Sequence, residues 1–434
     1  MNISSIISAI GNNSTPYPLL VRDCCIEVPS KILIARKENL KESRVKANDA
    51  TRERFIDEYV TSAIWLGGIP ATEKIADKFI SKRGYNPLVN IKLFSKKTPL
   101  QSVEANIERF KNVAEKDVQS AIADLVKVQN NKSVYEGLLT KKFVAATAIP
   151  TLIMGFVLPP LNFALTKKIK EKRAMDEYVS KNNFISAAFT SKEGSFGDFK
   201  ISNNVKSGNV SFKGSLTSAI ANLRTVDKMA ISDGGLTVGR VSTSRNKDEA
   251  YVNAFRMIGS MILNFVTPVY IAKGLDKLAN NLFKVNVNLD PIIIDNKEFV
   301  EAVKLGQIEL PKSSSEKDIL GFLDNNPKAM FSKFAAKLKK VTYLKSGYRD
   351  PRKFVDIKDM ANFRNEFERF IDMAKKSANP VNFANKAKYV KGANILANIG
   401  ISSFLLAYVL PKLQYGFNKL VTGSYTDPGL RDNA

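Results

Sequence analysis

The chain has 434 residues, of which 44% are hydrophobic and 25% are charged, so it is neither a disordered chain nor a collagen-like fibre. Lysine and arginine number 66 against 42 aspartates and glutamates, for a net charge of +24, which favours an anionic partner such as lipid headgroups or nucleic acid. The absence of histidine excludes histidine-based catalytic triads, general bases and metal ligands.

The N-terminal region, residues 1–58, begins irregularly and then predicts a charged helix. Its cysteines, Cys24 and Cys25, are adjacent and cannot form an ordinary disulfide, so we expect free thiols in a reducing compartment. The first apolar segment follows at residues 59–80 and contains the uncharged run YVTSAIWLGGIPAT. That run is too short to cross a bilayer by itself.

Residues 81–142 predict a helical insertion, because apolar residues recur there at helical spacing. The second apolar segment occupies residues 143–169, and its uncharged part is long enough to cross a bilayer. Basic residues flank it on both sides. Among them, we expect Lys167 and Lys168 to contact lipid headgroups.

The next region, residues 170–255, is polar and rich in serine, glycine, asparagine and lysine. Its alternating pattern predicts a small β or loop region at about 200–245. Backbone N–H groups and guanidinium groups together can hold a phosphate, and four residues here suit that role. They are Gly234, Gly235, Arg240 and Arg245. The stretch lacks the Gly-Lys-Ser/Thr ending of a P-loop, so a structural loop that docks one apolar segment on another is the alternative.

The third apolar segment, residues 256–283, spans a bilayer only if Arg256 and Lys273 extend toward the headgroups. Residues 284–392 form a second helical insertion, which opens with an expected strand at 291–295. The fourth apolar segment, residues 393–420, is again long enough to span, and a tail of residues 421–434 follows it.

The four apolar segments share a pattern of an aromatic residue, apolar residues, a proline and a later lysine. The stretch from Phe156 to Phe163 matches that from Tyr408 to Tyr415, and shorter versions surround the prolines of the other two segments. The lysines that follow the four prolines by eight or nine positions are Lys78, Lys167, Lys277 and Lys419. Because eight helical residues rise about 12 Å, we expect Lys277 and Lys419 also to reach lipid headgroups.

The sequence therefore predicts a mainly α-helical fold in which four apolar helices form a transmembrane bundle with basic helical insertions outside it. Glycines near the prolines favour close helix packing, so we expect the four segments to pack against one another, and crosslinks between cysteines introduced at Gly155 and Gly400 would test this. The alternatives are four isolated membrane anchors, or a soluble helical bundle with the same segments as its core.

The predicted function is that of a multi-pass membrane protein of structural or interaction type, whose basic regions contact the anionic headgroups of a lipid bilayer. Self-association or a membrane partner fits the same prediction. No enzyme activity, cofactor or metal is expected, because carboxylates such as Glu366 and Glu368 lie on lysine-rich helical faces and the apolar runs contain no ionisable residue. The alternative is a soluble cytoplasmic protein that binds nucleic acid or a phosphorylated ligand, although no nucleic-acid-binding motif supports it.

Overall fold

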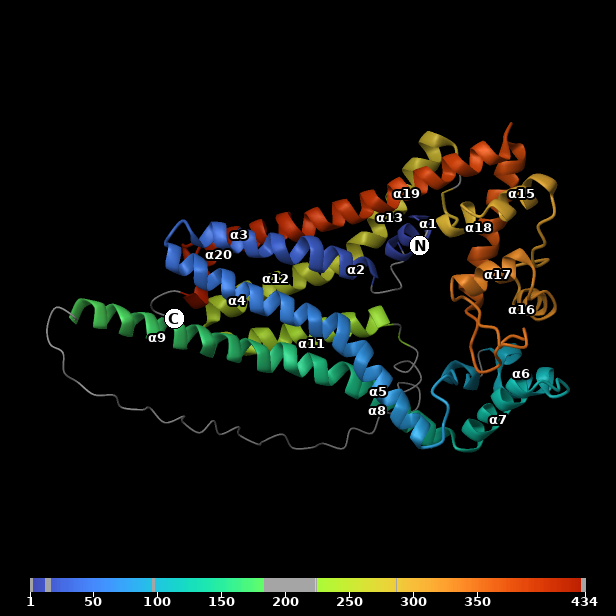
Figure 1. Ribbon diagram of the computed structural model, residues 1–434, viewed down its shortest axis with the longest axis horizontal. Coiled ribbons are helices and arrows are strands. Elements are labelled where there is room, and N and C mark those ends of the chain that lie inside the picture. The colour runs from blue at the N-terminus through green and yellow to red at the C-terminus, as the bar shows by residue number, and fades with distance from the viewer. Residues whose placement is uncertain are drawn as a thin grey trace.

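The computed structural model describes residues 3–11, 17–95, 98–182, 223, 225–285 and 287–430, and these ranges are mainly helical with no strand. Figure 1 shows a bundle of long helices on one side and a group of shorter helices on the other. The prediction of a mainly α-helical fold is confirmed.

The bundle is built from long helices, most of which consist of consecutive helical segments. The first two are α2 (Tyr17–Arg22), η1 (Asp23–Glu27) and α3 (Val28–Asn39), then α4 (Arg44–Ala63), η2 (Ile64–Gly68) and α5 (Ile69–Lys82). Next come α8 (Lys132–Leu152), η5 (Ile153–Val157) and α9 (Leu158–Asn182), then α11 (Thr225–Ser242). The last two are α12 (Lys247–Met261), η6 (Ile262–Val266) and α13 (Thr267–Phe283), then α19 (Pro380–Phe404), η7 (Leu405–Val409) and α20 (Leu410–Thr422).

A five-residue π-helical turn interrupts five of these helices, and each time a proline follows the turn after one intervening residue. Proline lacks the backbone N–H, and its ring clashes with the carbonyl four residues earlier in a regular α-helix. Single π-helical turns occur as bulges inside α-helices. Here the wider turn accommodates the proline ring without ending the helix. The prolines are Pro29, Pro70, Pro159, Pro268 and Pro411.

The four predicted segments pack within one bundle. The α5 helix lies on α8, α13 lies on α19 and α12 lies on α20, while α11 lies between α8 and α12. The closest backbone approach joins η5 to α11, because a Cβ added to Gly239 would lie 2.7 Å from the Cα of Gly155. Gly155 therefore packs on α11, whereas a Cβ on Gly400 would meet nothing within 4 Å.

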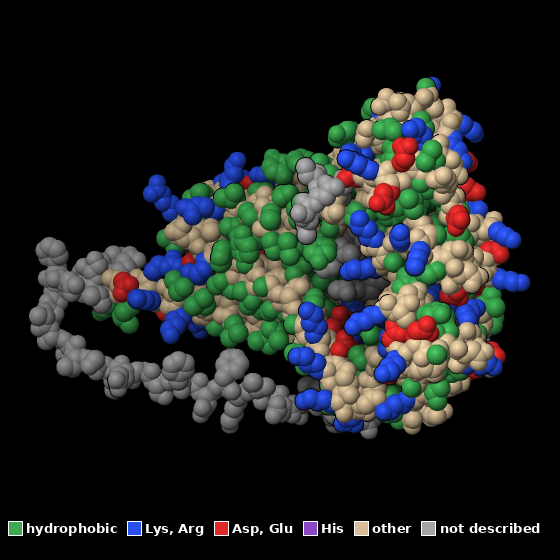
Figure 2. Space-filling view, turned by 45° about the vertical axis from the view of Figure 1, so that its right-hand side comes forward, with side chains coloured by type: hydrophobic (Ala, Val, Ile, Leu, Met, Phe, Trp, Pro, Cys, Tyr) green, Lys and Arg blue, Asp and Glu red, His purple; other side chains and the backbone are tan. Residues whose placement is uncertain are grey.

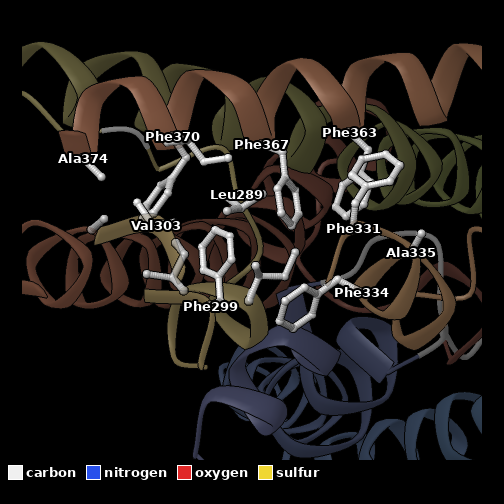
Figure 3. Packing of buried hydrophobic residues seen from close by; sticks show 14 of the residues in the cluster. Leu289, Phe299, Val303, Phe331, Phe334, Ala335, Phe363, Phe367, Phe370 and Ala374 are labelled. Atoms are coloured by element: carbon white, nitrogen blue, oxygen red, sulfur yellow. The ribbon is translucent and has the colours of Figure 1, made fainter. Parts of the chain in front are cut away.

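The two helical insertions form one body at the end of the bundle, which we call the helical head (residues 83–131 and 287–379). Its elements are η3 (Ile91–Phe94), η4 (Pro99–Gln101), α6 (Val103–Phe110), α7 (Lys116–Asn130), α14 (Pro291–Ile294), α15 (Lys297–Leu305), α16 (Glu316–Asn325), α17 (Met330–Lys337) and α18 (Ile357–Lys376). The side chain of Gln101 accepts a hydrogen bond from the Val355 N–H at 2.8 Å and donates one to its carbonyl at 3.0 Å, which ties the insertions together. Figure 3 shows the core of the head, in which Phe299, Phe331 and Phe367 pack edge to face.

Three expectations are corrected. Residues 225–242 of the expected β or loop region form helix α11, whereas residues 183–222 lie outside the described residues. The expected strand at 291–295 is the short helix α14, because Asp290 caps it by accepting a hydrogen bond from the Ile292 N–H at 2.8 Å.

The third correction concerns the number of spans. In the part of the chain that the structure describes, three helices are long and apolar enough to cross a membrane: Lys132–Asp176, Lys247–Phe283 and Pro380–Thr422. The α4–α5 helix, which carries the first apolar segment, is not among them. Its apolar run is short, and the charged residues Glu53 to Glu58 precede it closely.

Two short elements complete the fold at opposite ends of the bundle. The α1 helix (Ile3–Gly11) packs on α14 and α19 beside the head. The C-terminal segment ends in η8 (Pro428–Leu430), which packs on α4 and α12 at the far end of the bundle.

Candidate functional site

Charged side chains from four helices meet inside the bundle. On η1 and α3, Asp23, Glu27 and Lys31 recur every four residues and share one helix face. The same spacing places Glu53 and Asp57 on one face of α4, and all of these side chains are largely buried. Buried charges are costly unless they are paired and hydrogen-bonded, so their partners decide what the site can do.

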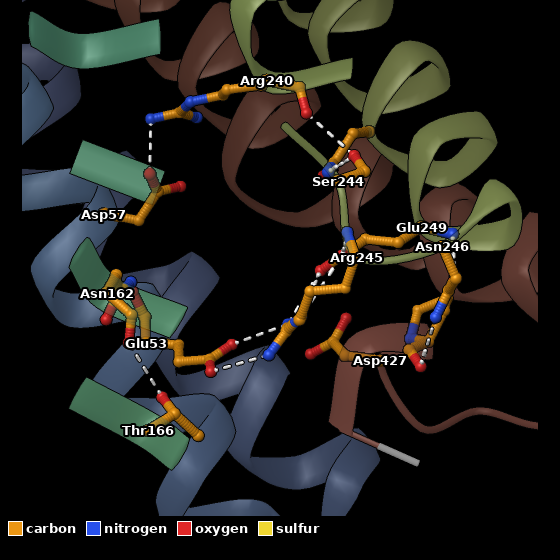
Figure 4. Close-up of polar contacts among 12 residues, drawn as sticks. Glu53, Asp57, Asn162, Thr166, Arg240, Ser244, Arg245, Asn246, Glu249 and Asp427 are labelled. Carbon is orange, nitrogen blue, oxygen red and sulfur yellow. Dashed lines mark hydrogen bonds and ion pairs between the residues drawn. The ribbon is translucent and has the colours of Figure 1, made fainter. Parts of the chain in front are cut away.

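The centre of the site is the carboxylate of Asp57, which pairs with Arg240 (Figure 4) and also lies near Arg256. The guanidinium of Arg240, only 5% of whose side chain is exposed, donates to Asp57 at 2.6 Å and to the hydroxyl of Thr61 at 2.7 Å. Arg256 approaches the other oxygen of Asp57 at 3.6 Å. Asp57 therefore holds α11 and α12 against α4.

Arg245 lies in the link between α11 and α12, and its guanidinium contacts side chains of α4, α12 and α9. It binds Glu53 with two parallel hydrogen bonds of 3.1 Å each and donates to Glu249 at 2.7 Å (Figure 4). Its guanidinium also lies 4.1 Å from the ring centroid of Phe163 on α9, in a cation–π arrangement. Forked arginine–carboxylate pairs of this kind are among the stronger protein hydrogen bonds.

A second group of charges lies nearer the middle of the bundle. Lys31 pairs with Glu27 on its own helix and, at 3.4 Å, with Glu58 on α4. Glu58 also accepts a hydrogen bond from Arg54 at 3.3 Å. On the neighbouring turn, Arg22 donates to the side-chain oxygen of Asn264 at 2.5 Å, so α2 is attached to the π turn η6.

Two small cavities of about 70 and 60 Å³ lie along this network, and Arg240 and Arg256 line both. Several buried polar atoms around them have no hydrogen-bond partner among the described residues, including Asn162 Oδ1, Arg240 Nε and Arg256 Nε. Cavities of this size and polarity suit a few water molecules. The network is therefore a polar interior that combines paired charges with unsatisfied groups.

The C-terminal segment closes the end of this interior. The carboxylate of Asp427 accepts hydrogen bonds from Asn39 at 3.2 Å and from the Tyr415 hydroxyl at 3.1 Å. Asn246, which caps α12 by accepting from the Glu249 N–H at 2.8 Å, donates to the carbonyl of Pro428 at 3.3 Å. The segment is thus attached to three of the bundle helices.

The structure brings together two of the four residues expected to contact an anion. Arg240 and Arg245 both line the larger of the two cavities, although each is already paired with carboxylates. Gly234 and Gly235 lie within α11, and a Cβ on Gly235 would meet the methyl group of Thr151 at 2.5 Å. These glycines therefore pack against a neighbouring helix, and anion binding by the two arginines stays a prediction.

The four lysines expected at lipid headgroups lie at the two ends of the bundle. Lys167 and Lys168 are exposed on α9, and Lys419 is exposed on α20, where it lies 4.7 Å from the ring centroid of Tyr425. Lys277 is exposed on α13, at the end next to the helical head. Headgroup contact by these lysines stays a prediction.

The sequence did not reveal the charged interior, because the charged residues outside the apolar runs resemble those of a solvated helix face. The prediction also missed the fifth copy of the proline module, in which Asp23 and Glu27 occupy the π turn before Pro29. A signal was present: Lys37 follows Pro29 by eight positions, as in the other copies.

Within the described residues, no group of three or more cysteine, aspartate or glutamate side chains is arranged to hold a metal ion. No protein family, curated protein or solved structure was found to match this chain.

Proposed function

We propose that the chain is a multi-pass membrane protein of structural or interaction type, with its helical bundle in the bilayer and the helical head outside. One observation carries the proposal: the polarity of the bundle is inverted relative to a soluble protein. Charges lie in its interior, and large apolar side chains lie on its surface. Ionisable residues in membrane proteins face the bundle interior in this way.

The apolar surface extends over several helices (Figure 2). Leu161 on α9 is 62% exposed, Tyr270 on α13 is 69% exposed and Phe404 on α19 is 56% exposed. Leu33 on α3 is also exposed, although the opposite face of its helix carries buried charges. Soluble monomers rarely expose apolar patches larger than a few hundred Å², so a surface of this kind favours contact with lipid.

The spacing of charged residues along two of the long helices fits the thickness of a bilayer. No charged residue lies between Lys142 and Lys167 on α8–α9, a rise of about 37 Å against a hydrocarbon core of about 30 Å. On α19–α20 the interval between Lys391 and Lys412 is about 32 Å by the same rise.

The basic ends of the bundle then lie at the depth of the headgroups. Lys167, Lys168 and Lys419 occupy one end and Lys277 the other, where anionic lipids attract each cation by about 1 kcal/mol. The paired interior charges hold neighbouring helices together, which suits a protein that acts by holding and presenting the helical head at a membrane surface.

A second candidate is a soluble protein that binds nucleic acid or a phosphorylated ligand, and one observation favours it. Arg173 on α9 pairs with Asp49, whereas Lys228 on α11 pairs with Glu73. Asp49 and Glu73 lie about 36 Å apart along α4–α5, so α9 ends and α11 begins at opposite ends of the bundle. The sequence that connects them, residues 183–224, is polar. If the bundle spans a bilayer, this connection has to pass from one side to the other, which is unfavourable for a polar segment. In a soluble protein the same connection lies in water at no such cost.

The two candidates are separated by extraction and two-sided labelling. Membranes from cells that express the chain are washed with high salt and then with alkaline carbonate. In a Cys24→Ser, Cys25→Ser background, Tyr178→Cys and Leu282→Cys are treated with an impermeant maleimide in sealed vesicles. We expect retention in the membrane and labelling of one of the two positions, because they lie at opposite ends of the bundle.

Release by salt or carbonate would contradict the membrane proposal, as would equal labelling of both cysteines. Binding of DNA or RNA that weakens steeply with salt would then support the second candidate.

A further inference from the structure

A large cavity lies where the bundle meets the helical head. Its volume is about 760 Å³, and an adjoining hollow of about 440 Å³ shares Asp276, Asn288 and Glu366 with it. The walls come from α1, α13, α18 and α19. Small-molecule sites are concave and of this size, whereas the cavities of the charged interior are about tenfold smaller.

Most carboxylates around this cavity already have partners. Asp276 binds Lys391 at 2.9 Å and the side chain of Asn394 at 3.0 Å. Asp359 binds Lys340 at 2.6 Å, and Asp290 accepts a hydrogen bond from Ser8 at 2.9 Å. The side chains of Lys340 and Lys391 are thus engaged on either side of Glu366.

Glu366 is the exception. It lines both the cavity and the hollow, and it makes no hydrogen bond or ion pair with any described residue. Three cations line the hollow beside it: Lys273, Lys277 and Arg369. These also form no ion pair with a described carboxylate. An unpaired anion and unpaired cations therefore face one empty volume.

Part of the remaining wall is apolar. Ala272 of α13 and Ile395 and Ile399 of α19 line the cavity, and both helices continue from there into the apolar surface of the bundle. A ligand bound here would therefore contact the Glu366 carboxylate, the basic hollow and these apolar side chains at the same time. Lys273 marks the end of the uncharged run of α13, which is the depth of the headgroups in the proposed bilayer arrangement.

We propose that this junction binds a compound that carries both a phosphate and an ammonium group, as phosphoethanolamine does. Glu366 binds the ammonium group, and Lys273, Lys277 and Arg369 bind the phosphate. The source is either the headgroup of a zwitterionic phospholipid, whose acyl chain follows Ile395 and Ile399, or a soluble phosphorylated amine. Only the lipid source rests on the proposed membrane location.

The test uses the full chain in detergent micelles and isothermal titration with phosphoethanolamine, ethanolamine and ethyl phosphate. We expect phosphoethanolamine to bind more tightly than either single-group compound. Because removing one partner of a charge-assisted hydrogen bond costs roughly ten- to a hundredfold in affinity, Glu366→Gln should weaken phosphoethanolamine by that factor and leave ethyl phosphate unchanged. The matched control is Glu368→Gln, because Glu368 lies on the same helix, is half exposed and pairs with Arg364 at 2.8 Å.

A second arm identifies the source. The chain is purified from membranes that contain phosphatidylethanolamine and phosphatidylglycerol, and the retained lipid is measured by mass spectrometry. Retention of phosphatidylethanolamine that is lost in Glu366→Gln supports a lipid, whereas binding of free phosphoethanolamine without retained lipid supports a soluble compound.

The proposal is overturned if Glu366→Gln matches the wild type in both arms, or if phosphoethanolamine binds no better than ethyl phosphate and no phosphatidylethanolamine is retained. Carbonate release together with tight binding of free phosphoethanolamine would reject the membrane location and keep this site.

Discussion

The residues that distinguish this protein are charged side chains in places where charges are unfavourable. Asp57 is the clearest case, because it accepts a hydrogen bond from Arg240 and lies near Arg256 inside the bundle. A buried pair adds little stability relative to an apolar pair, whereas removing one member leaves the other charge buried without compensation. The interior network therefore determines which helices can be neighbours.

Arg240→Gln should lower the free energy of unfolding by roughly 3–5 kcal/mol, because Asp57 then loses its closest cation. The double variant Arg240→Gln, Asp57→Asn should recover part of the loss, since no unpaired charge remains. Chemical denaturation in detergent, followed by circular dichroism, measures both. Lys304→Gln, which breaks an exposed pair with Glu301 at 3.2 Å on α15 of the head, should cost about 1 kcal/mol or less. An equal loss in Arg240→Gln and Lys304→Gln would contradict this account.

Glu366 gives the head a pH dependence. Burial raises the pKa of its carboxyl group to about 7, against the opposing effect of Lys340 and Lys391 and with smaller raising contributions from Asp359 and Asp276. Lys273, Lys277 and Arg369 line the hollow on its other side. Between the ordinary pKa of 4.5 and about 7, the folded protein keeps a proton that the unfolded chain has lost. The free energy of unfolding therefore falls as the pH rises through this window.

Glu366→Gln removes that dependence. At pH 8 the variant should be more stable than the wild type by on the order of 2 kcal/mol, and the difference should disappear below about pH 4.5. Denaturation at pH 4, 6 and 8 without ligand measures it. A variant that is less stable than the wild type at pH 8 would show that Glu366 has a cationic partner in the free protein.

At the scale of elements, the repeated unit is a π turn followed by a proline. The sequence predicted four copies, because an apolar run, a proline and a later lysine can be recognised by eye. The fifth copy was not predicted, because Asp23 and Glu27 make its π turn charged and it therefore lacks an apolar run. These charges are tolerated because they lie in the interior of the bundle, which the sequence alone does not show. The β or loop region expected at about 200–245 was wrong for residues 225–242 for another reason: the glycines in Thr225–Ser242 serve helix packing, which local propensity does not reveal.

The contact between η5 and α11 gives a prediction at this scale. A methyl group at Gly239 would lie 2.7 Å from the backbone of Gly155, and backbone cannot move aside as a flexible side chain can. Gly239→Ala should therefore destabilise the protein by about 1–3 kcal/mol, the usual range for overpacking. Gly400→Ala is the control, because its added methyl group meets nothing and alanine favours a helix by up to about 1 kcal/mol. Thermal unfolding compares the two, and equal midpoints would contradict the close approach.

At the scale of the whole molecule, composition and apolar runs were enough to predict a mainly helical fold. They were not enough to predict that residues 83–131 and 287–379 form one head, because contacts such as Gln101 with Val355 join residues far apart in the chain. The charged interior was hidden for the same reason, since each charged residue alone resembles part of a solvated helix face. Only the assembled bundle shows which faces meet.

The inverted polarity of the bundle is tested most directly by spin labels on its surface. In a Cys24→Ser, Cys25→Ser background, labels at Leu161, Val266 and Phe404 report collisions with oxygen, which dissolves in hydrocarbon, and with a water-soluble nickel complex. A label at Lys333, exposed on α17 of the head, serves as the aqueous reference. The account predicts that the three bundle labels collide with oxygen and are shielded from nickel, whereas Lys333 shows the reverse. Nickel collisions at all three bundle positions as frequent as those at Lys333 would place this surface in water and contradict the account.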